Sequence, residues 1–186
     1  MYWWMCIDET GHPEPKTVPT ISYQLEELSD PCFVPDFSNC RFEFEREECV
    51  DDAIMDFATF LHPAFFISEK AFDIVGKFIS PVSRPLPLSC EGYIYYFIKI
   101  DVELDLFDYE ASKFSRWGMY ERVEDEVNMV TRVIIKHPPP DSPDIFRLKG
   151  RSGVRMNIIV SDRFKKTYEE NGLTGLYFKP AEPLPN

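Results

Sequence analysis

The sequence has no long hydrophobic run. None of its apolar stretches approaches the roughly 20 consecutive residues that a membrane-spanning helix needs, and the apolar start at residues 1–7 is followed at once by Asp8 and Glu9. That start also lacks the basic flank and the longer apolar stretch of a secretory signal. The sequence therefore predicts a cytoplasmic protein that does not associate with membranes.

Patterned cysteines and the common catalytic motifs are also missing. The five cysteines are irregularly spaced and include no C-x-x-C pair, which argues against a disulfide framework and a zinc site. A nucleophile elbow, a Walker loop, a dinucleotide-binding glycine pattern and a zinc-protease helix are all absent. The histidines, His12, His62 and His137, each lie near a proline and are predicted to be loop residues. We therefore predict no catalytic residue, cofactor or metal, although a triad assembled from distant residues stays an alternative.

Basic side chains are scarce in the first third of the chain. The formal net charge is −12, and residues 1–60 carry 14 acidic side chains against 3 basic ones, whereas residues 131–186 carry 6 against 10. A negative field repels nucleic acid and anionic membranes and raises the encounter rate with a basic partner. Two interpretations stay open: the charge keeps the protein soluble, or it attracts a basic protein.

What is present is enough apolar material for one folded domain. A chain of 186 residues with 44% hydrophobic residues predicts a single domain over residues 1–186, with an N-terminal strand and proline-rich loop at 1–33 and a core at 34–180. Prolines predict a loop at 8–19 and, at 81–87, an extended segment unsuited to a central strand. Strand patterns occur at 2–7, 41–47, 92–100, 101–106, 127–135, 145–148, 158–160 and 176–178. The predicted class is α+β, with two or three helices packed on a mixed or antiparallel sheet.

Three segments have helical spacing. Residues 50–61 repeat apolar side chains every three or four positions. The other two segments each follow a strand and begin at a serine cap, Ser68 or Ser161. Residues 67–70 and 160–163 match in chemistry, which indicates either a degenerate repeat or the same local capping physics used twice. Four residues are too few to decide between these interpretations.

The densest carboxylate cluster lies at residues 43–52. Charges that repeat along the outer face of a strand are typical of solvated surface, and the cluster lacks the loop spacing and turn glycine of a calcium site. As a docking face for a basic partner, the carboxylates need only be exposed. A basic cluster at residues 147–155 is predicted to be mainly a charged turn, because no nucleic-acid-binding module surrounds it.

Several motifs together resemble one bacterial family. They are FFISEK at residues 65–70, YYFI with VELD at 95–105, FRLKG at 146–150, VSDRFK at 160–165 and GLTGLYF at 172–178, with VPDF at 34–37. In these motifs the chain resembles a family of bacterial immunity proteins, the eleventh class of polymorphic-toxin immunity proteins. The resemblance covers residues 34–110 loosely and residues 145–180 well, and it does not extend to the proline-rich start or to residues 112–143.

The resemblance implies a cytoplasmic protein encoded beside a secreted or contact-delivered toxin, such as a type VI effector. It implies neutralisation by a tight one-to-one complex, without catalysis and without a cofactor. The predicted partner is a cognate protein toxin, which the acidic charge suggests is basic. The predicted contact residues are Glu43, Glu45, Glu47, Glu48, Asp51, Asp52, Trp117 and Tyr120. The alternatives are an enzyme with an unrecognised active site and a non-catalytic regulatory adaptor.

Overall fold

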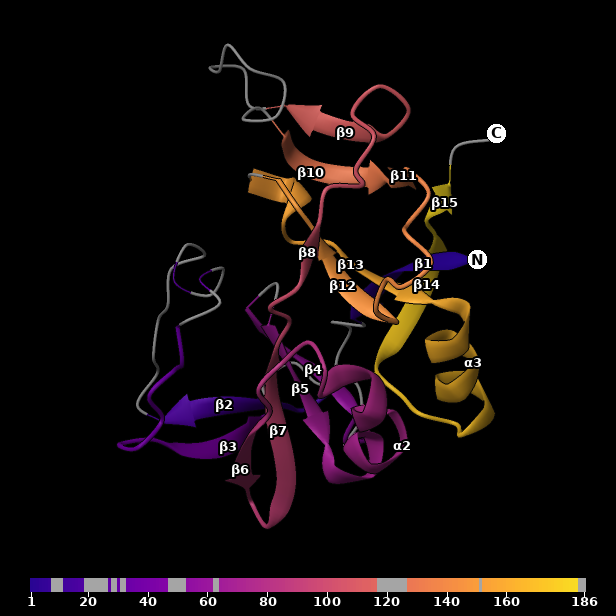
Figure 1. The fold of residues 1–186 in the computed structure, drawn as a ribbon. Helices are drawn as coiled ribbons and strands as arrows, with labels where there is room; N and C mark the ends of the chain where they lie inside the picture. Colours follow the sequence, from indigo (N-terminus) through magenta and orange to yellow (C-terminus); the bar gives the residue numbers. More distant parts are fainter. Residues whose placement is uncertain are drawn as a thin grey trace.

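The computed structural model describes residues 1–7, 12–18, 27, 30, 33–46, 53–61, 64–116, 127–150 and 152–183. In these residues two helices, α2 (Glu69–Ile79) and α3 (Asp162–Glu170), pack on mixed sheets, so the fold is α+β as predicted (Figure 1). A short 3-10 helix, η2, spans Ser152–Val154. The strands are β1 (Tyr2–Ile7), β2 (Glu14–Val18), β3 (Arg41–Glu45), β4 (Phe57–Leu61), β5 (Ala64–Ser68), β6 (Leu86–Cys90), β7 (Tyr93–Lys99), β8 (Glu103–Leu104), β9 (Lys113–Arg116), β10 (Val127–Arg132), β11 (Ile134–Ile135), β12 (Ile145–Leu148), β13 (Ile158–Ser161), β14 (Leu176–Pro180) and β15 (Glu182–Pro183).

Two large sheets replace the single predicted sheet. The five-stranded sheet has the order β14-β1-β13-β12-β8, and the six-stranded sheet has the order β2-β3-β6-β7-β5-β4. Strands β9 and β10, and strands β11 and β15, form two small two-stranded sheets. The two edge strands of the six-stranded sheet, β2 and β4, come together, and the Glu14 carboxylate of β2 accepts a hydrogen bond from the Thr59 backbone amide of β4. The sheet is therefore curled.

The four strands around each helix have the same arrangement. We call each helix with its four strands a unit. The strands of the first unit follow the order β4, β5, β7, β6, and those of the second unit follow the order β12, β13, β1, β14. Neighbouring strands in both orders are antiparallel. In each unit the chain passes from the second of these strands into the helix and then into the fourth. The third strand differs in origin, because β7 follows β6 directly whereas β1 comes from the N-terminus. The two capped helices therefore belong to a permuted structural repeat, which the sequence left undecided.

The strand registers of the two units agree residue by residue. The cap serine of each unit pairs with a tyrosine in the third strand, and the next residue of that strand pairs with a proline in the fourth. The same number of residues separates the serine from the proline in both units. The equivalent residues are Ser68 and Ser161, Tyr95 and Tyr2, Tyr96 and Trp3, and Pro87 and Pro180.

A contact between the helix and the third strand also recurs. In the first unit the ring of Phe72 stacks on that of Tyr96, with 4.2 Å between the centroids. At the equivalent positions of the second unit, Lys165 Nζ lies 4.3 Å from the ring centroid of Trp3. The geometry is kept although an aromatic pair is replaced by a cation–π contact.

An aspartate directly before the first strand of each unit holds the helix cap. The Ser68 hydroxyl donates to Asp56 Oδ1 at 2.8 Å and accepts from the backbone amide of Ala71 in the first turn of α2. The Ser161 hydroxyl donates to Asp144 in the same way at the start of α3. In both units the serine backbone amide also donates to the aspartate carbonyl at 2.8 Å. We call this arrangement the aspartate–serine lock.

A basic side chain at the second residue of each helix completes the lock. Lys70 Nζ lies 3.0 Å from Asp56 Oδ2, and the Arg163 guanidinium donates to both carboxylate oxygens of Asp144. Burial raises the pKa of Asp144, but the hydrogen bonds from Arg163 and Ser161 outweigh burial, so this pKa lies below its usual value. Asp56 also accepts from the backbone amide of Thr174 at 3.1 Å, which ties the first unit to the loop after α3.

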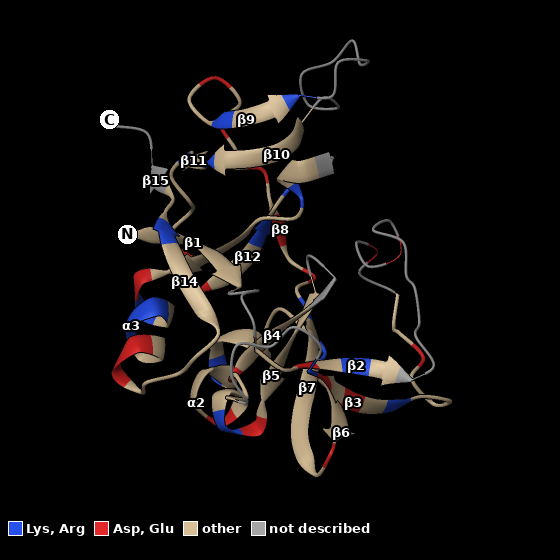
Figure 2. Cartoon of the chain, turned by 180° about the vertical axis from the view of Figure 1, so that it is seen from behind, with Lys and Arg blue, Asp and Glu red and all other residues tan. Residues whose placement is uncertain are grey.

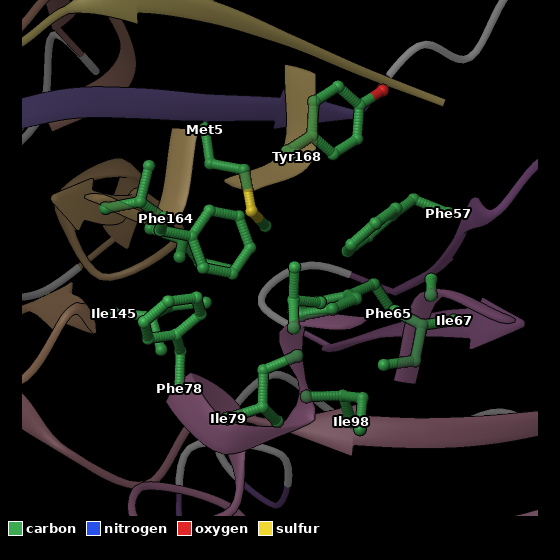
Figure 3. Close-up of a cluster of buried hydrophobic side chains, with 14 of the residues drawn as sticks. Met5, Phe57, Phe65, Ile67, Phe78, Ile79, Ile98, Ile145, Phe164 and Tyr168 are labelled. Atoms are coloured by element: carbon green, nitrogen blue, oxygen red, sulfur yellow. The ribbon is translucent and has the colours of Figure 1, made fainter. Parts of the chain in front are cut away.

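The two units share one hydrophobic core. Equivalent side chains from both units enter it, among them Ile67 with Val160 and Ile98 with Met5 (Figure 3). Burial of such side chains is the main stabilising contribution in a fold of this kind. A separate cluster lies on the outer face of each unit, one around Phe66 and Phe97 and one around Phe146 and Ile159.

The predicted helix at residues 50–61 is wrong over its described part. Residues 57–61 form strand β4, which pairs with β5, and residues 53–55 are irregular. Phe57 faces the shared core and Ala58 faces the outer cluster of the first unit. A strand buried on both faces has no alternating pattern, so its apolar residues matched helical spacing by chance.

Other segment predictions were partly right. The predicted loop at 8–19 contains strand β2, whose Pro15 is tolerated because β2 is an edge strand. The proline-rich segment at 81–87 leads into β6, which pairs along its length with β7 but meets β3 only at Cys90. Residues 101–106 do not continue β7, since only β8 is a strand and it belongs to the other sheet. The strands predicted at 2–7, 92–100, 145–148, 158–160 and 176–178 are confirmed.

We expect Asp56→Asn to lower the free energy of unfolding by about 2–3 kcal/mol, because it removes a buried carboxylate that accepts hydrogen bonds from Ser68, Lys70 and Thr174. The matched control is Glu45→Gln, which removes an ion pair between two half-exposed side chains, Glu45 and Lys16, and should cost less than about 1 kcal/mol. Urea denaturation of both variants measures the difference. Equal losses in the two variants would contradict the role given to the lock.

Candidate functional site

A groove lies on the outer face of β1 and β14. Its volume is about 390 Å³, which is within the range of ligand and side-chain binding pockets. Trp4 and Cys6 of β1 and Tyr177 and Lys179 of β14 form its floor. The opposite wall comes from β10 and from the η2 region, and it comprises Asn128, Met129, Val130, Gly153, Met156 and Asn157.

Strand alternation explains why these floor residues share one face. Along β1, Met5 and Ile7 enter the shared core, whereas Trp4 packs against the outer cluster of the second unit. The β1–β14 register places Lys179 opposite Trp4 and Tyr177 opposite Cys6. Cross-strand neighbours of this kind point to the same side of a sheet.

The wall of the groove is held by close backbone contacts. Asn157 is buried, and its side-chain amide donates to the Gly153 carbonyl at 2.6 Å and to the Val154 carbonyl at 2.9 Å. A Cβ at Gly153 would clash with the Asn128 carbonyl of β10, so glycine is required for this approach. These contacts fix β10 and η2 relative to each other on one side of the groove.

One positive charge lies over an aromatic floor. Lys179 Nζ is 4.7 Å from the ring centroid of Trp4 and 5.4 Å from that of Tyr177, and among the described residues that line the groove Lys179 is the one that carries a formal charge. Burial raises the pKa of the Cys6 thiol, while the charge of Lys179 and a hydrogen bond from Tyr177 oppose this rise. The groove therefore offers apolar surface together with a single ammonium group.

Two apolar side chains at the groove are strongly exposed. Met129 is 60% exposed and Tyr177 is 48% exposed. Exposed methionine and tyrosine next to a hollow are typical of surfaces that bind protein side chains, because methionine adapts its shape and tyrosine adds rigid contact area. Chemically, the groove can bind an apolar side chain and a neighbouring anion. Its lining residues include no pair of carboxylates and no histidine.

The predicted carboxylate face is only partly described, and its described part is balanced by bases. Glu43 pairs with Arg41 at 2.9 Å, and Glu45 pairs with Lys16 of the neighbouring strand. Figure 2 shows acidic and basic segments side by side on β2 and β3. The other predicted contact residues, Glu47, Glu48, Asp51, Asp52, Trp117 and Tyr120, lie outside the described residues.

The basic cluster at residues 147–155 is not simply a charged turn. Arg147 belongs to β12, is 1% exposed and pairs with Glu103 at 2.8 Å. Burial lowers the pKa of the Arg147 guanidinium, and the charge of Glu103 opposes this. The pairing of β8 with β12 brings these two residues opposite each other. Arg147 is therefore an interior residue that links β8 to the five-stranded sheet.

Sequence reasoning missed the groove. Trp4 and Tyr177 were assigned only to strands, and their side-chain direction depends on a pairing between the two ends of the chain that no local pattern encodes. Asn128 in the opposite wall belongs to β10, which lies in the segment 112–143 to which the family resemblance does not extend. His12 and His137 lie in irregular segments as predicted, and His62 is outside the described residues.

The described parts of the chain contain neither a metal-ligating cluster nor a membrane-spanning helix. Within them, no three His, Cys, Asp or Glu side chains are grouped closely enough to hold a metal ion. No helix in the same residues is both long and apolar enough to cross a membrane.

Comparison with known families gives one match. The model described as "Immunity protein family (Imm11)" matches residues 80–183, more than half of the chain. The matched range includes β10, η2 and β14, which line the groove, but not β1. No curated protein matches the sequence.

The electrostatics of the groove can be tested through Cys6. Because the ammonium of Lys179 favours the Cys6 thiolate, we expect Lys179→Gln to raise the pKa of Cys6 and to slow its alkylation by iodoacetamide at pH 8–9. Mass spectrometry of the modified peptides measures the rate for each cysteine. Cys90, whose pKa burial raises to about 12, is the internal reference. Lys16→Gln on β2 is the matched control, and equal alkylation rates in both variants would contradict the assigned influence.

Proposed function

Because the chain belongs to the immunity protein family Imm11, we propose that it protects a bacterial cell by binding a cognate protein toxin and blocking its activity. The match over residues 80–183 carries this proposal. The proposed complex is stoichiometric, forms in the cytoplasm and requires no cofactor. The toxin is proposed to be delivered by a contact-dependent or type VI secretion system.

The groove supports binding rather than turnover. An inhibitory complex needs an interface on the order of 1,600 Å² in total, with a few buried anchors near its centre. Trp4, Tyr177 and Met129 supply apolar and aromatic surface of the kind that forms such anchors, and Lys179 supplies one charge for orientation. Among the residues that the structure describes, the groove lining includes no acid–base pair of the kind that general acid–base catalysis uses.

We further propose that the acidic residues of the 43–52 segment steer a basic toxin toward the protein. The net charge of −12 supports long-range attraction. The ion pairs of Glu43 and Glu45 reduce their own share of this field, so the proposal assigns most of it to Glu47, Glu48, Asp51 and Asp52. Trp117 and Tyr120, between β9 and β10, are proposed as further contacts.

The whole of residues 1–186 is proposed to act as one immunity domain, with the family-like core at 34–180. The shared core supports this, since β1 at the N-terminus and α2 in the middle of the chain both contribute side chains to it. Removal of β1 would take the third strand out of the second unit.

Co-expression with the toxin encoded next to this gene tests the proposed function. We expect full-length protein to rescue cells from the toxin, and purified protein to form a one-to-one complex with the toxin domain. Size-exclusion chromatography with light scattering measures the stoichiometry. Failure to rescue, together with no complex between folded partners, would overturn the proposal.

Charge reversal tests the steering role. In Glu47→Lys and Glu48→Lys combined, we expect the association rate with the toxin to fall several-fold at low salt and its dependence on salt to weaken. Stopped-flow kinetics at several ionic strengths measures both. Reversal of Glu169 and Glu170 on α3 is the control for net charge alone. Unchanged association kinetics in the first variant would contradict the steering proposal.

A further inference from the structure

The repeat gives the groove a counterpart in the first unit. The register makes Phe97, Lys99, Arg84 and Leu86 the equivalents of Trp4, Cys6, Tyr177 and Lys179. These same four residues of the first unit line a cavity on the outer face of β6 and β7. The two hollows therefore occupy equivalent places on equivalent strands.

The chain itself fills the hollow of the first unit. Phe33, Val34 and Pro35, which lie in the irregular segment before β3, also line this cavity, and its remaining volume is only about 10 Å³. Pro35 is buried, and the ring of Phe37 lies 5.5 Å from that of Phe97. The equivalent hollow in the second unit keeps about 390 Å³.

A main-chain contact also holds the filling segment. Lys99 is only 6% exposed, and its ammonium group donates to the backbone carbonyl of Asp30. Asp30 and residues 33–37 thus combine a backbone contact at one end with apolar side chains packed on the face of the sheet. They show what chemistry this surface accepts: an irregular peptide segment with aromatic and proline side chains and a half-exposed valine between them.

From this internal occupant we infer that the open groove binds an apolar, non-helical segment of the toxin. The inference rests on the proposed function and adds to it the surface and the chemistry of the bound segment. The segment lies across the faces of β1 and β14 as residues 33–37 lie across β6 and β7.

The differences between the two hollows define how the bound segment differs from the internal one. Leu86 is replaced by Lys179, and the buried Lys99 is replaced by Cys6. The open groove therefore has no ammonium at the position that binds the main-chain carbonyl, and it has one beside the aromatic floor. A segment that carries a carboxylate next to an aromatic or branched side chain is complementary to this arrangement.

The occupant lies on the face of the sheet and does not extend it by another strand. The backbone amide of Leu176 at the start of β14 donates to the Tyr168 hydroxyl at 2.9 Å, and the Leu176 carbonyl accepts a hydrogen bond from the same hydroxyl at 3.2 Å. Pro180 at the other end has no amide hydrogen. Both ends of this sheet edge are thus closed to an added strand.

Binding of the isolated toxin domain to groove variants tests the inference. We expect Met129→Glu and Lys179→Glu each to weaken the complex at least tenfold by biolayer interferometry, because each places a negative charge where the segment's carboxylate and apolar side chain bind. The matched controls are Tyr93→Glu and Ile94→Glu, which alter apolar residues of similar exposure, 53% and 43%, on the first unit. These controls should change affinity less than twofold.

A photo-crosslinking amino acid, benzoylphenylalanine, at position 129 tests the chemistry of the occupant. We expect crosslinks to one toxin segment that contains an aromatic or branched residue beside an aspartate or glutamate. Crosslinks only within the chain or to a second copy of it, or only to a basic toxin segment, would overturn the inference. Wild-type binding by Met129→Glu and Lys179→Glu would overturn the groove while leaving the proposed function intact. Absence of binding between the unmodified protein and the toxin domain would overturn both this inference and the proposed function.

Discussion

The hydrogen bonds between an aspartate and a helix-capping serine organise this fold twice. In each lock the serine hydroxyl donates to the carboxylate and accepts from the first turn of the helix, while its backbone amide pairs with the aspartate carbonyl. The aspartate lies just before a strand, so one side chain fixes the strand register and the helix start together. Asp56 extends this control to the second unit, because Thr174 follows α3 and donates to it.

The second unit is complete only because the N-terminus supplies its third strand. β1 pairs with β13 on one side and with β14 on the other, and its Met5 and Ile7 enter the core shared with the first unit. This pairing joins the two ends of the chain, and such long-range contacts carry a large loop-closure cost that the shared core must offset. It also brings Trp4 next to Lys179, so the candidate groove and the fold depend on the same pairing.

Local physics was predictable from the sequence, and long-range pairing was not. Ser68 and Ser161 correctly predicted the starts of α2 and α3, because helix capping depends only on neighbouring residues. The segment around Phe57 was wrongly predicted to be a helix, because a strand buried on both faces is as rich in apolar residues as a buried helix. The resemblance to immunity proteins, carried by residues 145–180, was confirmed by the family match. The floor of the groove could not be predicted, since its residues come from the first and the last strand of one sheet, and their common face follows from a register that only the folded chain defines.

A repeated scaffold explains how one face of this protein is available for binding. Each unit has an apolar outer face that would be costly to leave wholly exposed. The first unit covers its face with residues 33–37 and thereby builds the cluster around Phe97. In the second unit β10 and η2 cover part of the outer face, because Val130 and Val154 pack into the cluster around Phe146 and Ile159. They leave a hollow over Trp4 and Tyr177. Because the aspartate–serine lock and the shared core hold both units, the second face can keep its hollow without loss of the strand register. In the proposed complex with the toxin, the free energy of covering this face is released on binding, which is what a protein that acts by forming a tight complex requires.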